Sequence, residues 1–311
     1  MKALTYEDVN LVPRFSALES RSAADTSVNF CGTTFSLPFL PANMEDVIDL
    51  RIAKLFSSIG MFYIFHRFDK SLNPYEFVKL ANQENWKLIS ISVGVEQESI
   101  KQLGSIASES LRVDFVCIDV AHGDHEKVLR MIEHIKHILP RTKVIAGNVA
   151  TGKSAFRLQN AGADAVKAGI GGGRICTTRF QTGFHVPMFT CVSDVSSCVD
   201  IPVIADGGVK YYGDVAKALV AGAKMVMCGG IFASCIDSPA KSVGGLKEYR
   251  GSTSLAAKKT NKHIEGITLK LESDITILER VREMKEALQS SISYAGGSDL
   301  SCFESVEYYT S

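Results

Sequence analysis

The sequence lacks the features that place a protein in a membrane, on nucleic acid or among disulfide-rich secreted chains. Acidic and basic residues number 34 each, so there is no net charge to attract nucleic acid or an anionic membrane surface. The chain contains no run of eighteen apolar residues, and its first fifteen residues have no signal-peptide core. The eight cysteines form no C-x-x-C pair and have no histidines at zinc spacing. We therefore expect a reduced, cytoplasmic protein with neither nucleic-acid nor membrane partners.

What the sequence does have is a regular alternation of apolar runs and helical periods. Apolar residues make up 46% of the 311 residues, which is enough for a large buried core. Continuous apolar runs are typical of parallel strands buried on both faces. They occupy residues 38–42, 61–65, 88–95, 115–121, 143–148, 164–169, 201–207 and 224–230. Helical spacing of apolar residues follows in segments such as 46–60, 126–139, 213–223 and 278–297.

Eight strand–helix units in one chain of this length predict an α/β fold, a (β/α)8 TIM barrel formed as one domain by residues 1–311. A doubly wound sheet is the alternative, but nothing marks a reversal of strand order. Two loops are much longer than usual: residues 169–186 after the sixth run and 244–273 after the eighth. Both follow carboxyl ends of predicted strands, where such barrels carry their chemistry. We predict a catalytic cysteine loop in the first and a flap in the second.

Glycines lie at the ends of the seventh and eighth predicted strands. Asp206, Gly207 and Gly208 close the seventh, and Gly229 and Gly230 close the eighth. Barrels commonly bind phosphate through backbone N–H groups at these two places. Tight turns alone would explain either pair, but both together favour a phosphate site. Because a carboxylate repels phosphate, Asp206 is better suited to accept bonds from sugar hydroxyls, and the combination predicts a nucleotide.

Cys176 is the candidate nucleophile. It lies in the first long loop, flanked by Arg174 and Arg179, whose positive charge favours a thiolate. The alternative is a small buried hydrophobe, as most cysteines of a reduced chain are. Glu265 is the leading carboxylate of the second long loop, and its alternative is a solvated surface charge.

The sequence also raises the questions of whether histidines take part in the site and whether the chain contains a metal or dinucleotide motif. His66 and His122 follow the second and fourth predicted strands, where a place in the site and a structural role are equally open. No cluster of residues has the spacing of a metal site. The stretch GIGGGR does not open a helix, so a Rossmann dinucleotide motif is excluded.

From end to end the chain resembles the IMP dehydrogenase and GMP reductase family. The markers are YEDVNLVP, SRSAADT, PANM, SISVGV, IDVAHG, VIAGNVAT, AGADAVKAGIGGGRICTTR, IADGG and GDVAKALVAGAKMVMCGG. The resemblance implies a (β/α)8 barrel, assembled as a homotetramer, that binds a purine 5′-monophosphate and a nicotinamide dinucleotide. The run at 61–65 leads directly into a helical segment, which leaves no room for the regulatory insertion of the dehydrogenases. The tail also looks like the bacterial reductase ending, so the reductase branch is the closer match.

The resemblance implies roles for residues as well. Cys176 would attack C2 of the purine, while Thr178 and Glu265 would manage the protons. The substrate-binding residues are Met44, Arg174, Asp206, Gly207, Gly208, Gly229, Gly230, Tyr249, Gly251 and Ser252. The cofactor-binding residues are Arg67, Asp119, Ala121 and His122. The backbone carbonyls of Gly171, Gly173 and Cys176 correspond to potassium ligands of the family, which makes K+ a second candidate cofactor beside NADPH.

The expected function is NADPH-dependent reductive deamination of GMP to IMP and ammonia. Several departures from the family pattern leave the exact nucleotide and the choice of cofactor open. Gly172 stands where proline is common, Arg174 where serine is common, and the stretches TGFHVPMF and SCIDSPA differ from the usual ones. The alternatives are an IMP dehydrogenase, a reductase of a deoxy or modified guanylate, and a purine-nucleotide-binding barrel without catalysis.

Overall fold

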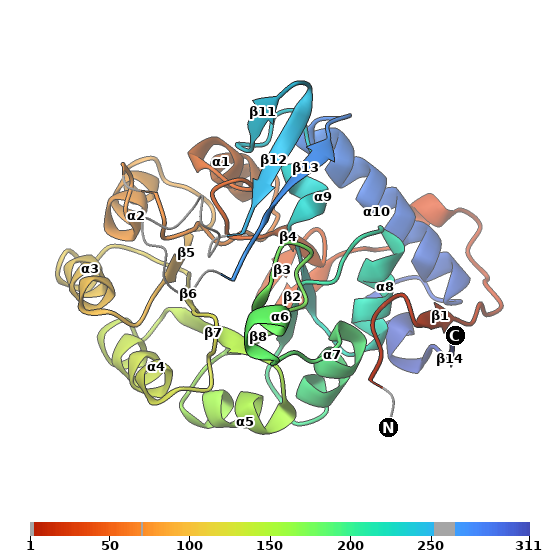
Figure 1. Ribbon diagram of the computed structural model, residues 1–311, viewed down its shortest axis with the longest axis horizontal. Coiled ribbons are helices and arrows are strands. Elements are labelled where there is room, and N and C mark those ends of the chain that lie inside the picture. Colours follow the sequence, from red (N-terminus) through yellow and green to blue (C-terminus); the bar gives the residue numbers. More distant parts are fainter. Residues whose placement is uncertain (1–2, 70, 252–264) are drawn as a thin grey trace.

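A curled parallel sheet forms the centre of the protein (Figure 1). The computed structural model describes residues 3–69, 71–251 and 265–311. Seven strands pair in the order β4-β10-β9-β8-β7-β6-β5, and every pair within this sheet is parallel. They are β4 (Phe39–Pro41), β5 (Ser90–Val93), β6 (Phe115–Asp119), β7 (Lys143–Val149), β8 (Ala165–Ala168), β9 (Val203–Asp206) and β10 (Met225–Cys228). The prediction of an α/β fold with buried parallel strands is confirmed.

The apolar run at 61–65 was predicted to be one of eight regular strands, but it pairs with the sheet at a single residue. It meets the sheet through one parallel bridge, from Phe65 to Ile91 of β5. The amide of Phe65 donates to the Ser90 carbonyl at 2.9 Å, and the Ser92 amide donates to the Phe65 carbonyl at 2.8 Å. Pairing is therefore limited to the carboxyl end of the run, although Met61 to Phe65 are all buried. Burial alone explains the apolar pattern here.

Helices cover the outer face of the curled sheet (Figure 1). They are α1 (Leu50–Ser58), α2 (Pro74–Gln83), α3 (Gln97–Ser108), α4 (Glu126–Ile138), α5 (Gly152–Asn160), α7 (Met188–Ser196), α8 (Gly213–Val220) and α10 (Ile277–Tyr294). Local sequence sets several of their starts. Asn73 caps the amino end of α2, and Thr276 caps that of α10, each through a capping box. In this motif the side chain of the cap residue accepts a bond from the amide of a glutamate three residues later, and the glutamate carboxylate accepts one from the amide of the cap residue. The four helical segments predicted from periodicity correspond to α1, α4, α8 and α10.

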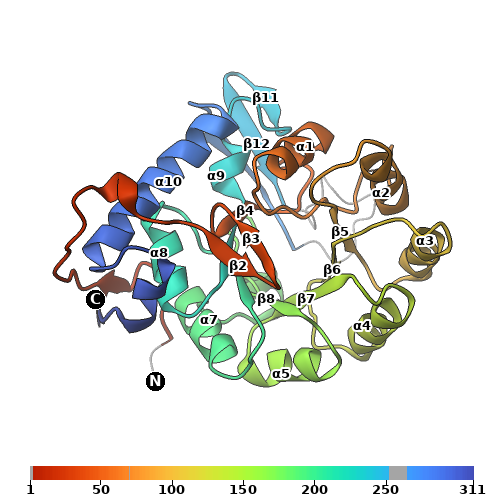
Figure 2. The same ribbon diagram turned by 180° about the vertical axis from the view of Figure 1, so that it is seen from behind.

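An aromatic cluster closes the amino end of the sheet. The antiparallel strands β2 (Val28–Phe30) and β3 (Thr33–Phe35) lie across that end, as Figure 2 shows. Phe62 packs between the two strands and the sheet, with ring centroids 5.2 Å from Phe30, 5.0 Å from Phe35 and 4.9 Å from Phe115. Such tilted and edge-on contacts are the favourable aromatic geometries. With this end filled, the carboxyl ends of the strands remain for a ligand.

The remaining elements lie at the edges. The chain ends pair through β1 (Val9–Leu11) and β14 (Tyr308–Thr310), and two 3-10 turns, η1 (Arg21–Ala23) and η2 (Leu300–Ser305), lie nearby in sequence. A small antiparallel sheet of β11 (Lys241–Val243), β12 (Leu246–Arg250) and β13 (Thr268–Glu272) follows the short helix α9 (Gly230–Ala233). The predicted flap 244–273 therefore begins and ends in strands, and its residues 252–264 lie outside the described part. No helix in the described ranges is long and apolar enough to cross a bilayer.

Candidate active site

A cleft of about 1190 Å³ opens at the carboxyl ends of the parallel strands. Both predicted loops contribute to its wall. Of the predicted site residues that the structure describes, all line this cleft except His122. His122 is exposed and outside the lining, and Ser252 falls outside the described residues. The structure thus brings together residues from nearly the whole length of the chain, while their individual roles stay predictions.

A hydrogen-bonded chain joins Cys176, Thr178 and Glu265. The Cys176 thiol donates to Thr178 Oγ1 at 3.1 Å, and Thr178 Oγ1 donates to Glu265 Oε2 at 2.6 Å. Thr178 begins the short helix α6 (Thr178–Thr182), two residues after the cysteine. A thiol, a hydroxyl and a carboxylate in hydrogen-bonding sequence can pass a proton from the sulfur to the carboxylate.

Backbone pairing holds the two loops in register. Cys176 and Gly266 form an isolated antiparallel bridge. On either side of it, the Thr177 amide donates to the Glu265 carbonyl at 2.8 Å, and the Ile267 amide donates to the Ile175 carbonyl at 3.0 Å. Because these bonds lie next to the side chains of Cys176 and Glu265, they fix the position of Glu265 relative to the thiol.

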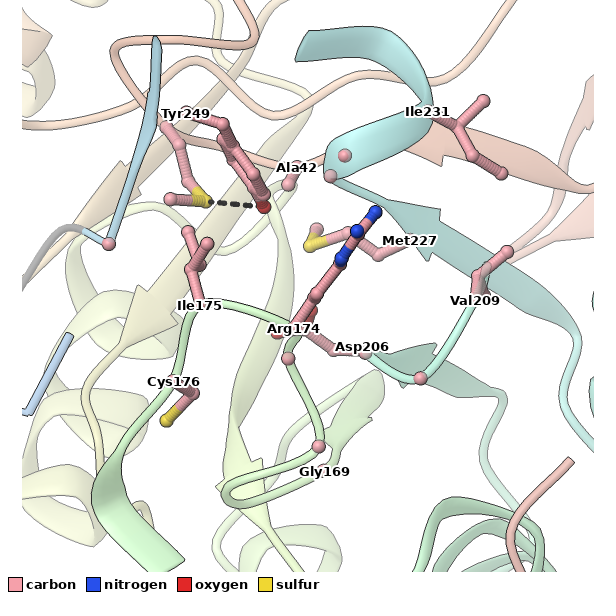
Figure 3. Close-up of a pocket in the computed structure, with 18 of the residues that line it drawn as sticks. Ala42, Gly169, Arg174, Ile175, Cys176, Asp206, Val209, Met227, Ile231 and Tyr249 are labelled. Atoms are coloured by element: carbon pink, nitrogen blue, oxygen red, sulfur yellow. Dashed lines mark hydrogen bonds between the residues drawn. The ribbon is translucent and has the colours of Figure 1, made fainter. Parts of the chain in front are cut away.

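The two arginines beside Cys176 extend to different places. Figure 3 shows the Arg174 side chain extending away from the sulfur of Cys176 and toward the start of α9, where Gly230 lies. The Arg179 guanidinium lies 4.4 Å from the centre of the Phe180 ring, and both of these residues are exposed. The sequence argument that both arginines favour the thiolate is therefore not supported by this geometry. Arg174 instead points to the predicted phosphate site.

Glycines leave room for backbone and tyrosine at that site. A Cβ at Gly229 would lie 2.1 Å from the Tyr249 hydroxyl. A Cβ at Gly207 would lie 3.0 Å from the backbone of Gly172 and Gly173, and Gly207 has a φ of +111° that side chains rarely adopt. These clashes show why the glycines are required whatever the ligand is. They allow β9, the cysteine loop and Tyr249 to approach one another closely.

Lys167 is a site residue that the sequence analysis missed. It projects from β8, is 3% exposed, and bridges Asp119 Oδ1 at 2.8 Å and Asp206 Oδ2 at 2.7 Å. Burial alone would lower the pKa of Lys167, but Asp119 and Asp206 outweigh it and raise the pKa. Burial would likewise raise the pKa of Asp119, yet the nearby Lys167 holds it below its usual value. A lysine within an otherwise apolar strand, as in DAVKAG, was the signal available in the sequence.

Two asparagines complete this network, and they were also missed. Asn43 Nδ2 donates to Asp119 Oδ2 at 3.0 Å. Asn148 Nδ2 donates to Asp206 Oδ2 at 2.8 Å and to the Gly169 carbonyl at 2.7 Å. The two bonds that Asp206 accepts from Lys167 and Asn148 therefore use the same oxygen, Oδ2. This arrangement orients the carboxylate at the end of β9.

Two neighbouring basic residues, His66 and Arg67, have different surroundings: Arg67 lies in the cleft and His66 in the core. Arg67 lines the cleft, with its NH2 group 3.4 Å from the Asp119 carbonyl and its guanidinium 4.6 Å from the Phe68 ring centre. His66 is buried, stacked on Phe65 at 5.0 Å, and accepts a bond from the Phe68 amide. Burial lowers the pKa of His66 and favours the neutral ring. Of the two roles left open for His66, the structural one fits.

The fold and the cleft define a class: an α/β protein with a curled parallel sheet, whose carboxyl-end cleft combines a thiol with glycine-rich turns. Comparison with known proteins gives the family. The model of the family described as "IMP dehydrogenase / GMP reductase domain" matches residues 3–310, so the chain belongs to that family.

Curated relatives are similar over nearly the whole chain. A protein named GMP reductase from Staphylococcus carnosus is 43% identical over 314 residues, which cover 99% of this chain and 96% of the relative. A GMP reductase from Lactococcus lactis is 44% identical over 309 residues, covering 97% and 93%. A third, from Staphylococcus aureus, is 41% identical and covers 99% and 96%.

Replacing Lys167 with methionine tests the buried bridge. Two carboxylates would lose their shared cation, and we expect the free energy of unfolding to fall by about 3–5 kcal/mol near neutral pH. Without the lysine, the pKa of Asp119 in the folded state rises above its unfolded value. Stability is then lost as the pH rises from the unfolded toward the folded pKa, so the penalty should be smaller at about pH 5 than at about pH 7.5. Urea unfolding at both pH values measures it.

The matched control is Lys54→Met. Lys54 pairs with Glu84 at 2.7 Å, but both side chains are exposed. This variant should stay within about 0.5 kcal/mol of the unmodified protein at either pH. A Lys167→Met penalty that is independent of pH would show that the lysine fills space without holding the carboxylates ionised.

Proposed function

We propose that the protein reduces GMP to IMP, releasing ammonia and consuming NADPH. The observation that carries this proposal is the chain from the Cys176 thiol through Thr178 to Glu265. Family membership and the relatives named GMP reductase support the same reaction. A cleft with a thiol, a proton path and glycine-rich turns at β9 and β10 has the parts that this reaction requires.

The cleft residues fit a nicotinamide cofactor beside the nucleotide. The cleft exceeds the range of about 300–1000 Å³ that is usual for one small ligand. Within the described residues, the buried Nε of Arg67 has no hydrogen-bond partner, although Arg67 lines the cleft. Arg67, Asp119 and Ala121 would hold the nicotinamide end. A bound reduced nicotinamide supplies the hydride that the purine C2 receives.

Cys176 performs the covalent steps of the proposed mechanism. Its thiol transfers a proton through Thr178 to Glu265, and the sulfur forms a bond to C2 of the guanine ring. The amine at C2 takes up the proton returned along the same path and leaves as ammonia when its bond to C2 breaks. After C2 receives the hydride, the C2–sulfur bond breaks, IMP is released and the thiolate is recovered. This division replaces one difficult exchange by two easier steps.

The other residues of the cleft anchor GMP. Asp206, oriented by Lys167 and Asn148, accepts bonds from the ribose hydroxyls. The backbone at Gly208 and Gly230 binds the phosphate, with the Tyr249 hydroxyl as a further donor. Gly207 and Gly229 give the backbone its close approach. Arg174 extends toward the start of α9 in Figure 3, where a guanidinium adds charge-assisted bonds to a phosphate.

Several wider features belong to the same proposal. Residues 1–311 form one catalytic domain. In it the run at 61–65, second along the chain, completes the (β/α)8 barrel as its eighth strand. The protein works as a homotetramer, measurable by light scattering. A potassium ion uses the carbonyls of Gly171, Gly173 and Cys176. The Gly173 carbonyl accepts one bond from the Cys176 amide at 3.0 Å, and its second lone pair suits a cation.

The direct test of function is absorbance at the reduced-nicotinamide band. GMP with NADPH should give oxidation of the cofactor and one ammonia per turnover, whereas IMP with NAD should give little reduction. The test includes 2′-deoxy-GMP and NADH, because departures in the sequence leave nucleotide and cofactor choice open. Efficient IMP oxidation without GMP reduction would instead identify a dehydrogenase.

Cys176→Ala is the control for that assay. It should abolish turnover but keep GMP affinity within about tenfold, because phosphate and ribose contacts anchor the nucleotide. Substantial remaining turnover would assign the nucleophile to another residue.

Glu265→Gln separates the two half-reactions. The change keeps the shape of the side chain but removes its titration, and general acid–base help is worth about 10²–10⁴-fold. We expect the larger loss in deamination, because Glu265 there both receives the thiol proton and returns it to the amine, whereas the reaction of IMP with NADP needs only the first of these transfers. First-turnover rates of the full GMP reaction and of IMP with NADP compare the two steps. Glu248→Gln on β12 is the matched control and should leave both rates unchanged. Equal slowing of both steps by Glu265→Gln would limit Glu265 to shaping the flap.

A further inference from the structure

An ion pair between a buried carboxylate and a half-buried arginine joins two segments of the cleft wall, and it is not part of the proton path. Asp46 is 2% exposed at its side chain and pairs with Arg250, which ends β12. The Arg250 amide donates to Asp46 Oδ2 at 2.7 Å, and Nε donates to the two carboxylate oxygens at 3.0 and 3.1 Å. The NH2 group also donates to Oδ1. Asp46 therefore holds both the backbone and the side chain of Arg250.

Each end of the pair is adjacent to a residue of the nucleotide site. On one side, Met44 is two residues before Asp46, and its carbonyl accepts bonds from the Val47 and Ile48 amides at 2.9 and 3.0 Å. On the other, Tyr249 directly precedes Arg250. The Tyr249 hydroxyl lies 3.6 Å from Met44 Sδ, the contact drawn as a dashed line in Figure 3.

The opposite end of β12 is anchored independently. Lys247 is 5% exposed, and its Nζ donates to the Ser238 carbonyl at 3.0 Å and the Ala240 carbonyl at 3.1 Å. Tyr249 lies between this anchor and Arg250, with its ring buried. Beyond the pair, the Gly251 amide donates to the Ile267 carbonyl at 3.1 Å, and the Ile267 amide donates to the Ile175 carbonyl at 3.0 Å. Backbone pairing therefore continues from β12 to the cysteine loop. β12 is thus held at both ends.

We propose that the Asp46–Arg250 pair is a positioning device that places the Tyr249 hydroxyl on the phosphate of GMP. The inference rests on the proposed function, because it assumes a purine 5′-monophosphate in the cleft. The Asp46 carboxylate binds the amide of the peptide unit that follows Tyr249, so it fixes the backbone from which the tyrosine projects. The guanidinium holds that carboxylate from the other direction. A hydroxyl fixed before binding loses less freedom on meeting the phosphate.

Binding of GMP without cofactor tests this, by calorimetry on the full chain. Tyr249→Phe should weaken GMP binding about tenfold, the usual effect of losing a bond to a charged group. Arg250→Met should weaken it by a similar factor. The double variant Arg250→Met/Tyr249→Phe should be no weaker than Tyr249→Phe alone, because both changes remove the same contact. Guanosine, measured by equilibrium dialysis, should bind all variants within about twofold of the unmodified protein.

Two further variants keep the test decisive. Arg250→Met leaves Asp46 buried and unpaired, so Asp46→Asn/Arg250→Met removes both charges and should show the same loss of GMP affinity in a folded protein. Lys241→Met, an exposed change on β11 of the same sheet, should leave affinity unchanged. Additive losses, or full GMP affinity in Asp46→Asn/Arg250→Met, would overturn the positioning role. Failure of the unmodified protein to bind GMP would overturn the proposed function itself.

Discussion

The cleft depends on one buried cation, Lys167. Two carboxylates, from β6 and β9, lie at the end of a hydrophobic sheet, where two like charges close together are costly without a shared cation. Lys167, on β8 between them, neutralises part of this charge, while Asn43 binds the second oxygen of Asp119 and Asn148 shares Oδ2 of Asp206 with the lysine. The orientation of both carboxylates in the cleft follows from this arrangement. The Cys176 thiol lies on a separate loop, which pairs with Gly266 and does not depend on this network.

Most of the fold was predictable because continuous apolar runs and helical periods are strong signals. Those signals show which residues are buried, however, and a buried segment need not form backbone hydrogen bonds with a neighbouring strand. Residues 61–65 are as apolar as their neighbours, yet only Phe65 reaches β5. The segment 244–273 shows the reverse case. Its polar residues suggested a loop, but β12 and β13 pair antiparallel with one face exposed, which polar side chains permit.

For the site, the sequence allowed us to identify residues by their type and by their position in the two long loops. Cys176 and Glu265 were singled out by their places in the two long loops, and Thr178 was added by the family resemblance. The structure brings the three within hydrogen-bonding distance. The sequence could not show the direction in which these side chains point. The two arginines beside the cysteine looked equivalent, yet Arg174 extends away from the thiol and Arg179 lies over the Phe180 ring. Asp46 and Arg250 lie 204 positions apart, and no periodicity links such residues.

The measurement that tests the mechanism most directly is a search for the covalent purine on the protein. The enzyme is mixed with IMP and NADP, quenched in acid within the first turnover, and digested for peptide mass spectrometry. The mechanism predicts a purine nucleotide adduct on the peptide that contains Cys176, and its loss when ammonia is added before quenching. Turnover without any adduct on Cys176, or an adduct on another of the cysteines, would contradict it.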